Sequence, residues 1–293
     1  MRRVGILLAV LLAMSSALAD DDGVPRRGAS GLSVFASAGT IWADDGNSNF
    51  YSGRPGNANT IDRVLHSNSY GTRIWNDLKT AGLISSSVGS YNELMVVEYP
   101  DMYYRTSLQI GLGIRYDYES GFGWLLRFDL WRLQAIGAFN LSTETGAGII
   151  GDRQYIRCGM LGKEDRINID LALTRTVALG DNLCLELDLG LNLNNAKVRE
   201  NLMEINGSTY SILDVWNGQS PDIGVGSYEY VNQGGLGLGV FMSGLVGYSI
   251  RGIGAVKAGY TCHHSKANLN GYDSWGWHHG LFVRFEINNF SFL

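Results

Sequence analysis

Two residues in the last part of the chain have the types and spacing of a nucleophile and its base. His263 and Ser265 lie two positions apart in the segment Cys262-His263-His264-Ser265. Residues two apart share one face of an extended chain, so the imidazole of His263 can take the proton of the Ser265 hydroxyl. The spacing therefore indicates nucleophilic catalysis.

The segment resembles the His-x-Ser-Asn region of the PagL family of lipid A deacylases, with Lys266 in place of the Asn. That family consists of eight-stranded outer-membrane barrels that hydrolyse an acyl ester of lipid A with a Ser, a His and an acidic residue late in the chain. The resemblance implies that His263 is the base and Ser265 the nucleophile. It covers this hairpin alone, and Asp273 is the only acidic residue nearby.

Three carboxylates form a second candidate. Asp170, Glu186 and Asp188 belong to two segments that we predict to be adjacent strands, and clustered carboxylates can share a proton for acid–base catalysis. The alternative is that they neutralise Arg and Lys side chains in a packed interior. We favour the second interpretation, because a narrow interior filled by its own side chains admits no substrate.

Four histidines late in the chain raise the question of a metal. His263 and His278 are predicted to be inward neighbours and His264 and His279 outward ones, and imidazole is a common zinc ligand. No pattern of Cys or carboxylate residues accompanies them. We therefore predict no metal and no cofactor, and our first interpretation assigns no catalytic residue.

The elements that hold these residues are strands. Six leucines occupy alternate positions from Leu183 to Leu193 and are interleaved with polar or small residues, so that one strand face is entirely hydrocarbon. Seven further segments alternate in the same way. The eight predicted strands are residues 31–42, 103–118, 122–132, 166–178, 183–194, 234–248, 254–263 and 276–288.

The connections between these strands alternate in length. Tight turns at residues 119–121, 179–182 and 249–252 alternate with long links, which we predict to be surface loops. The long links are residues 43–102, 133–165, 195–233 and 264–275. Short periplasmic turns and long extracellular loops are typical of outer-membrane barrels. We predict an all-β, transmembrane, antiparallel up-and-down barrel of eight strands, or of ten if an additional hairpin joins it.

The first long link has helical spacing. Residues 59–66 and 71–84 are predicted to form a short helical cap in the first extracellular loop, with Ile74, Leu78 and Ala81 on one face and Gly82 as the stop.

The apolar face of the barrel is predicted to point outward, toward lipid. The opposite face is rich in glycine and carries charges of both signs, as suits a narrow lumen filled by side chains. The charges expected to meet inside are Arg115, Arg127, Lys257 and Arg284 with Asp117, Asp129, Asp170, Glu186, Asp188 and Glu286. Aromatic residues at the strand ends are expected to form two girdles, Tyr116, Tyr118, Trp124 and Tyr248 at the turns and Trp42 and Trp277 at the loops. The alternative is a soluble periplasmic barrel that holds an apolar ligand inside.

The N-terminus has the features of a secretory signal peptide. Residues 1–19 combine Arg2 and Arg3, an apolar stretch and a small-residue cleavage site near Ala19, and residues 20–30 are predicted to form a periplasmic segment before the barrel of residues 31–293. The chain ending, Phe290 to Leu293, is similar to the aromatic ending that barrel-assembly machinery reads.

The cysteines and the net charge narrow the remaining choices. We expect Cys184 to be a packed free thiol and leave a bridge between Cys158 and Cys262 open. The net charge of −5 argues against nucleic acid.

Our first functional hypothesis is a non-enzymatic integral outer-membrane barrel of the OmpA and OmpW type. Its structured loops would bind a ligand, a partner protein or the envelope, or the barrel would act as a narrow pore. The expected partners are outer-membrane lipid and lipopolysaccharide, the barrel-assembly machinery and an unknown surface ligand. The alternatives are the lipid A deacylase that uses His263 and Ser265, and the soluble barrel.

Overall fold

The computed structural model describes residues 31–57, 59–84, 88–142, 155–180, 182–213, 233–250 and 254–287. The predicted signal peptide, the segment of residues 20–30 and the aromatic chain ending lie outside these ranges.

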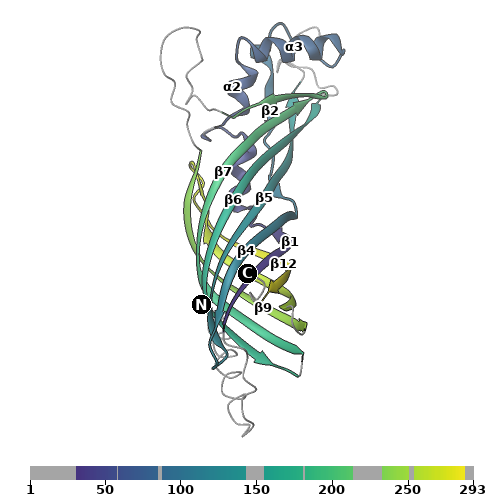
Figure 1. Ribbon diagram of the computed structural model, residues 1–293. Helices are drawn as coiled ribbons and strands as arrows, with labels where there is room; N and C mark the ends of the chain where they lie inside the picture. The colour runs from purple at the N-terminus through teal and green to yellow at the C-terminus, as the bar shows by residue number, and fades with distance from the viewer. Residues whose placement is uncertain are drawn as a thin grey trace, which may run out of the picture.

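Eight long strands form a closed antiparallel ring (Figure 1). Each strand pairs with the next along the chain, and β1 pairs with β12 to close the ring. The strands are β1 Gly31–Trp42, β4 Ser107–Asp117, β5 Phe122–Ser142, β6 Tyr155–Ala178, β7 Leu183–Ile205, β9 Gly234–Ile250, β10 Gly254–Lys266 and β12 Trp275–Ile287. Four shorter strands, β2 Met95–Glu98, β3 Tyr103–Tyr104, β8 Ser208–Ser211 and β11 Asn268–Leu269, pair with ring strands without entering the ring. The ring of the described residues therefore has eight strands, as predicted, and not ten.

The apolar face of the ring points outward. Leu173 is 74% exposed and Leu191 is 65% exposed, whereas their inward neighbours Thr174 and Asn192 are 1% and 2% exposed. A soluble barrel would bury the leucines, so that alternative is wrong. The lipid-facing orientation follows from the strand alternation.

The two aromatic girdles are present at the predicted ends of the ring. Tyr118 and Tyr248 are about half exposed at the end that carries the short turns, and Tyr116 stacks on Trp124 beside them. At the other end, which we call the loop end, Trp42 and Trp277 are exposed as expected. Trp275 and Tyr260 are exposed on the same wall.

Strands β5, β6 and β7 continue well beyond the ring at the loop end (Figure 1). Much of residues 133–165, and residues 195–205, are therefore strand, and the prediction that they are loop was wrong. The reason is that the inward face of β5 is apolar from Trp131 onward, through Leu133, Ala135 and Phe139. The strand alternation is unbroken there, but its two faces exchange their chemistry, so it no longer resembles a lipid-facing strand.

The first long link forms a cap over the loop end, above β5 to β7 in Figure 1. It contains the 3-10 helix η1 Asp45–Ser52, the helices α2 Ile61–Leu65 and α3 Tyr70–Thr80, the 3-10 helix η2 Tyr91–Glu93, and β2. The predicted helical spacing is confirmed for Ile74 and Leu78, which are fully buried. Ala81 is exposed instead of buried, because α3 ends at Thr80 and the chain turns at Gly82, whose φ is +68°.

One hydrophobic core joins the cap to the strand extensions. It collects apolar side chains from α2, α3, η1 and the inward faces of β5, β6 and β7, among them Phe50, Leu65, Leu78, Phe139, Met160 and Met203. The hairpin of β7 and β8 belongs to it, turning at Asn206 and Gly207, both with positive φ. Tyr210 of this hairpin donates a hydrogen bond to Asp77 of α3 at 3.1 Å. The loops therefore fold against one another as one packed body. No helix among the described residues is both long and apolar enough to cross a membrane.

Candidate functional site in the lumen and beneath the cap

A buried ionic cluster fills the part of the lumen nearer the short turns. Glu186 accepts hydrogen bonds from Arg284 at 2.5 Å and from Lys257 at 2.6 Å, and it also pairs with Arg115. Lys257 contacts Glu286 at 2.5 Å. All these side chains are at most 5% exposed, so each charge is stabilised by its partners and not by water.

A second cluster lies next to the first, further toward the loop end. Arg127 contacts Asp129 at 2.8 Å and Asp170 at 2.6 Å, and the guanidinium lies over the ring of Phe241. The remaining predicted members also face inward, Asp117 against Arg115 at 2.6 Å and Asp188 against Arg284 at 3.3 Å. The predicted inward meeting of the ten charges is confirmed, and the three carboxylates Asp170, Glu186 and Asp188 are all used in ion pairs.

Glycines in the lumen leave room for the aromatic rings of neighbouring strands. A Cβ on Gly113 would lie 2.3 Å from the ring of Phe35, and one on Gly39 would lie 2.7 Å from the Cβ of Phe282. These aromatic rings lie beside the cations, with Arg284 over Phe35 at 4.4 Å. The lumen is therefore packed with side chains, as the glycine-rich face predicts.

His263 and His278 lie at the top of the lumen, directly opposite each other on β10 and β12. Both are fully buried and both contact the ring of Trp131, at 5.1 and 5.6 Å between ring centroids. The Nδ1 of His278 accepts a hydrogen bond from the backbone N–H of Asp44, where η1 begins. This layer therefore forms the floor on which the cap rests.

The predicted catalytic pair faces the lumen. Ser265 is 2% exposed, and among the described residues no hydrogen bond joins it to His263. The Nε2 of His263 lies 3.1 Å from Thr261, and its Nδ1 lies 4.0 Å from Asp170. Asp273 lies on the outer rim, paired with Lys266 at 2.6 Å. The structure brings His263 and Ser265 to one face, but that face points into the lumen, away from lipid. The acidic residue near His263 is Asp170, whereas Asp273 pairs with Lys266.

The other two histidines considered as metal ligands, His264 and His279, contact aromatic side chains. His264 stacks on Trp277 on the outward face, and Tyr260 lies 2.6 Å from the Nδ1 of His279. Within the described ranges, no group of three or more His, Cys, Asp and Glu residues could hold a metal ion.

The cysteines are unpaired. Cys184 is free, as predicted. The open question of a bridge between Cys158 and Cys262 is answered in the negative, because both are free. Cys158 is buried in the cap core, where burial raises the pKa of its thiol to about 12, whereas Cys262 lies on β10, below the cap.

The base of the cap is held by a buried polar cluster that the sequence analysis missed. Tyr51 of η1 donates a hydrogen bond to Glu164 of β6 at 2.6 Å, and Tyr104 of β3 donates to the same oxygen at 3.2 Å. Arg166 donates to the other carboxylate oxygen at 2.5 Å. Burial and the adjacent Glu164 raise the pKa of both tyrosines well above its usual value. One sequence signal points to this cluster. The alternation of β6 continues back through Cys158, within the residues 133–165 that were predicted to be a loop.

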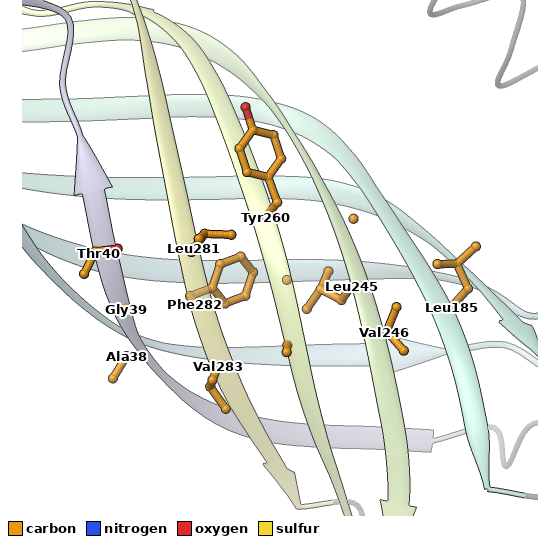
Figure 2. A pocket seen from close by; sticks show the side chains of 13 residues that line it. Ala38, Gly39, Thr40, Leu185, Leu245, Val246, Tyr260, Leu281, Phe282 and Val283 are labelled. Atoms are coloured by element: carbon orange, nitrogen blue, oxygen red, sulfur yellow. The ribbon is translucent and has the colours of Figure 1, made fainter. Parts of the chain in front are cut away.

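The outer wall carries a shallow groove of about 640 Å³ (Figure 2). Its floor is made by small residues that include Ala38, Gly244 and Ala258. Larger side chains surround the floor, among them Leu185, Val246, Tyr260, Leu281 and Val283. The lining comes from β1, β12, β10, β9 and β7, and its chemistry suits hydrocarbon chains of the surrounding lipid.

The closed ring, the lipid-facing leucines and the packed ionic lumen decide the class of molecule. The chain has the architecture of a small outer-membrane β-barrel. No family model matches the sequence, and no curated protein sequence matches it.

Solved structures similar to this chain include three barrels of that kind. Neisserial surface protein A is 12% identical with a TM-score of 0.42, covering 89% of this chain and 99% of that chain. Ail, the attachment invasion locus protein of Yersinia pestis in complex with the heparin analogue sucrose octasulfate, is 9% identical with a TM-score of 0.30, covering 87% and 99%. LpxR from Salmonella typhimurium is 9% identical with a TM-score of 0.23, covering 86% and 99%.

Proposed function

We propose that the protein is a non-enzymatic outer-membrane barrel whose extracellular cap is a rigid surface for binding a ligand, a partner protein or another envelope component. The observation that carries the proposal is the single apolar core that joins the cap to β5, β6 and β7. A flexible loop would have to be ordered at the moment of binding, whereas a packed cap presents its surface already formed.

The packed lumen argues against the narrow pore. Arg127, Asp170 and Arg284 are fully buried in the middle of the ring. We expect purified protein in planar bilayers to show no stepwise conductance. Regular channel openings by the wild-type protein would contradict the closed-barrel part of the proposal.

The position of His263 and Ser265 argues against the lipid hydrolase. We expect lipid A from outer membranes with and without the protein to have the same mass spectrum, and Ser265→Ala to change nothing. Loss of one acyl chain that depends on Ser265 would contradict the non-enzymatic proposal and favour the deacylase. Heat-modifiable gel migration verifies that each variant is folded.

The upper cap offers a contact surface. Met95 is 62% exposed and Tyr155 is 44% exposed, and they lie in register on either side of Ser142. Val97 beside them is 51% exposed. Apolar patches of this kind on a folded surface are typical of interaction sites.

The test of this surface uses cells that display the protein on a panel of immobilised glycans and proteins. We expect retention that is lost when Met95, Val97 and Tyr155 are all changed to Ser. The control is Arg54→Gln, elsewhere on the cap. Retention of neither wild type nor control on any surface would contradict the binding proposal.

Export and insertion complete the proposal. We assign residues 1–19 to a cleaved signal peptide, residues 20–30 to a periplasmic segment, and insertion to the barrel-assembly machinery. N-terminal sequencing of protein from the outer-membrane fraction should begin near Asp20. Recovery of the protein as a soluble periplasmic species would contradict the location.

A further inference from the structure

The outward face of β5, β6 and β7 changes sharply where these strands leave the lipid-facing belt. Ile110, Leu130 and Ile167 lie in register there, and Ile110 and Ile167 are 45% and 50% exposed. The next outward row, two residues further along β5 and β6, is Arg132 and Asp165, in register with Lys197 of β7. On β4 the residue in register with Arg132 is the exposed Leu108, so the charged row begins at β5. On β5 and β6 the belt therefore ends against a row of charges.

A second charged row follows directly. Gln134, Lys163 and Glu200 are in register, and the backbone of Arg105 donates a hydrogen bond to the carbonyl of Gln134. Arg199 projects beside them at the irregularity in β7. Two residues further along β5, the outward side chain is Ile136, in register with Tyr103. The charges thus occupy a band about 7 Å tall, two rows at the strand rise.

This band, which we call the cationic rim, has an excess of positive charge. It contains five cations, Arg105, Arg132, Lys163, Lys197 and Arg199, and two carboxylates, Asp165 and Glu200. Arg199 holds Asp165 at 2.6 Å and Lys163 holds Glu200 at 2.8 Å. Arg132 is only loosely paired, at 3.9 Å from Asp165, and its side chain is 71% exposed. Cations therefore remain to receive an external anion.

The opposite wall has a different composition at its loop end. The outward side chains of β1, β10 and β12 include Trp42, Trp275 and Trp277, and Lys266 is paired with Asp273 at 2.6 Å. Cations that only anchored the barrel at the membrane surface would be expected around the whole circumference. Among the described residues, the cations at this level cluster on β5, β6, β7 and the adjoining Arg105, whereas Lys266 on the opposite wall is already paired, which indicates a localised site.

We propose that the cationic rim binds a phosphorylated lipid headgroup of the outer leaflet, the chemical class to which lipid A belongs. The order of chemistry along the wall is the order within such a lipid, with the apolar rows beside acyl chains and the cations beside phosphates. Arginine guanidinium groups match phosphate geometry in two-point contacts, and basic residues at a membrane surface attract anionic lipid. The proposal rests on the outer-membrane location and names a partner for it.

The test is a titration of the full mature protein, folded in a phosphate-free zwitterionic detergent, with bisphosphorylated lipid A and with its dephosphorylated form, followed by native mass spectrometry. The test variant combines Arg132→Gln, Lys197→Gln and Arg199→Gln. The matched controls are Arg175→Gln, an exposed cation at the turn end of β6, and Lys266→Gln on the opposite wall. Heat-modifiable migration checks the fold of each.

We expect bisphosphorylated lipid A to bind the wild type about tenfold or more tightly than the dephosphorylated form. The triple variant should lose that preference while both controls keep it. Millimolar inorganic phosphate should not displace the lipid. Equal binding of both lipids, equal binding by wild type and triple variant, or displacement by inorganic phosphate would each overturn the proposal. Failure in this titration leaves the outer-membrane location intact, since fractionation tests that separately.

Discussion

Tyr51 of the cap and Glu164 of the barrel wall are joined by a hydrogen bond of 2.6 Å, although 113 positions separate them in the chain. Both side chains are fully or almost fully buried, and Arg166 and Tyr104 complete the cluster around the carboxylate. The contact fixes the first loop to β6 at the level where the lipid-facing belt ends. Cap and barrel therefore form one unit.

Removal of the Tyr51 hydroxyl should loosen the cap and leave the ring intact. We expect Tyr51→Phe to lower the free energy of unfolding of the cap by about 1.5–3 kcal/mol, because a buried hydrogen bond to a charged group is lost. Limited proteolysis of the cap measures this. Tyr70→Phe, an exposed tyrosine on α3, is the control. Equal protease resistance of Tyr51→Phe and wild type would show that the contact does not hold the cap.

The same cluster predicts how the cap responds to alkaline pH. Burial and Glu164 raise the pKa of Tyr51 and Tyr104 above the ordinary value of 10.0. Since the folded pKa is the higher one, the stability contribution is complete below pH 10 and is lost as the pH rises further, because the unfolded chain loses its protons first. Proteolysis from neutral pH to beyond pH 10 should show increasing cleavage. The double variant Tyr51→Phe, Tyr104→Phe should respond less steeply, and an identical slope would contradict the assignment.

Glu186 is the shared partner of three cations, so its neutralisation should be costly. Glu186→Gln leaves Arg115, Lys257 and Arg284 with reduced compensation in a buried site and should destabilise the barrel by about 3–5 kcal/mol. Urea unfolding, followed by heat-modifiable gel migration, measures the change in the free energy of unfolding. Asp117→Asn, whose side chain is 23% exposed at the edge of the same cluster, should cost less. Equal effects of the two changes would mean that the cluster does not centre on Glu186.

The orientation of β7 predicts that substitutions at two adjacent positions impair membrane insertion for different reasons. Leu189 is 56% exposed to lipid, and Leu189→Arg should cost about 2–4 kcal/mol and reduce membrane insertion, whereas Leu189→Ala should insert. At Gly190 an added Cβ would lie 2.1 Å from the carbonyl oxygen of Leu171, so Gly190→Ala should fail by steric conflict. Insertion yield into lipid vesicles separates the cases. Normal insertion of Leu189→Arg would reverse the assignment of the faces.

The fold of the membrane belt could be predicted because one rule, alternation, governs it. The bounds Gly31–Trp42 of β1 and the inward meeting of Arg115 with Glu186 follow from the pattern of one face apolar and one polar. Alternation continues beyond Arg132, but there the inward side chains Leu133 and Phe139 are apolar and the outer ones, such as Arg132 and Gln134, are polar, so the two faces no longer follow the pattern of the belt. A single sequence does not reveal at which residue the solvent around a strand changes from lipid to water.

The candidate site was predictable only in part. The shared face of His263 and Ser265 follows from spacing, but the burial of His263 against Trp131 depends on a residue far away on β5. The cluster of Tyr51 and Glu164 joins two segments that were both predicted as loop. Contacts of that kind arise from tertiary packing, which local periodicity does not encode.

The closure of the ring has a consequence for the order of assembly. Val34 pairs with Ile287, so the seam between β1 and β12 joins the two ends of the barrel sequence. Such distant partners meet late, because the chain between them must be ordered first. Until then both seam strands present unpaired backbone groups that can template aggregation. The pairing of β1 with β12 is therefore the step that converts an aggregation-prone open sheet into a closed barrel without exposed edges.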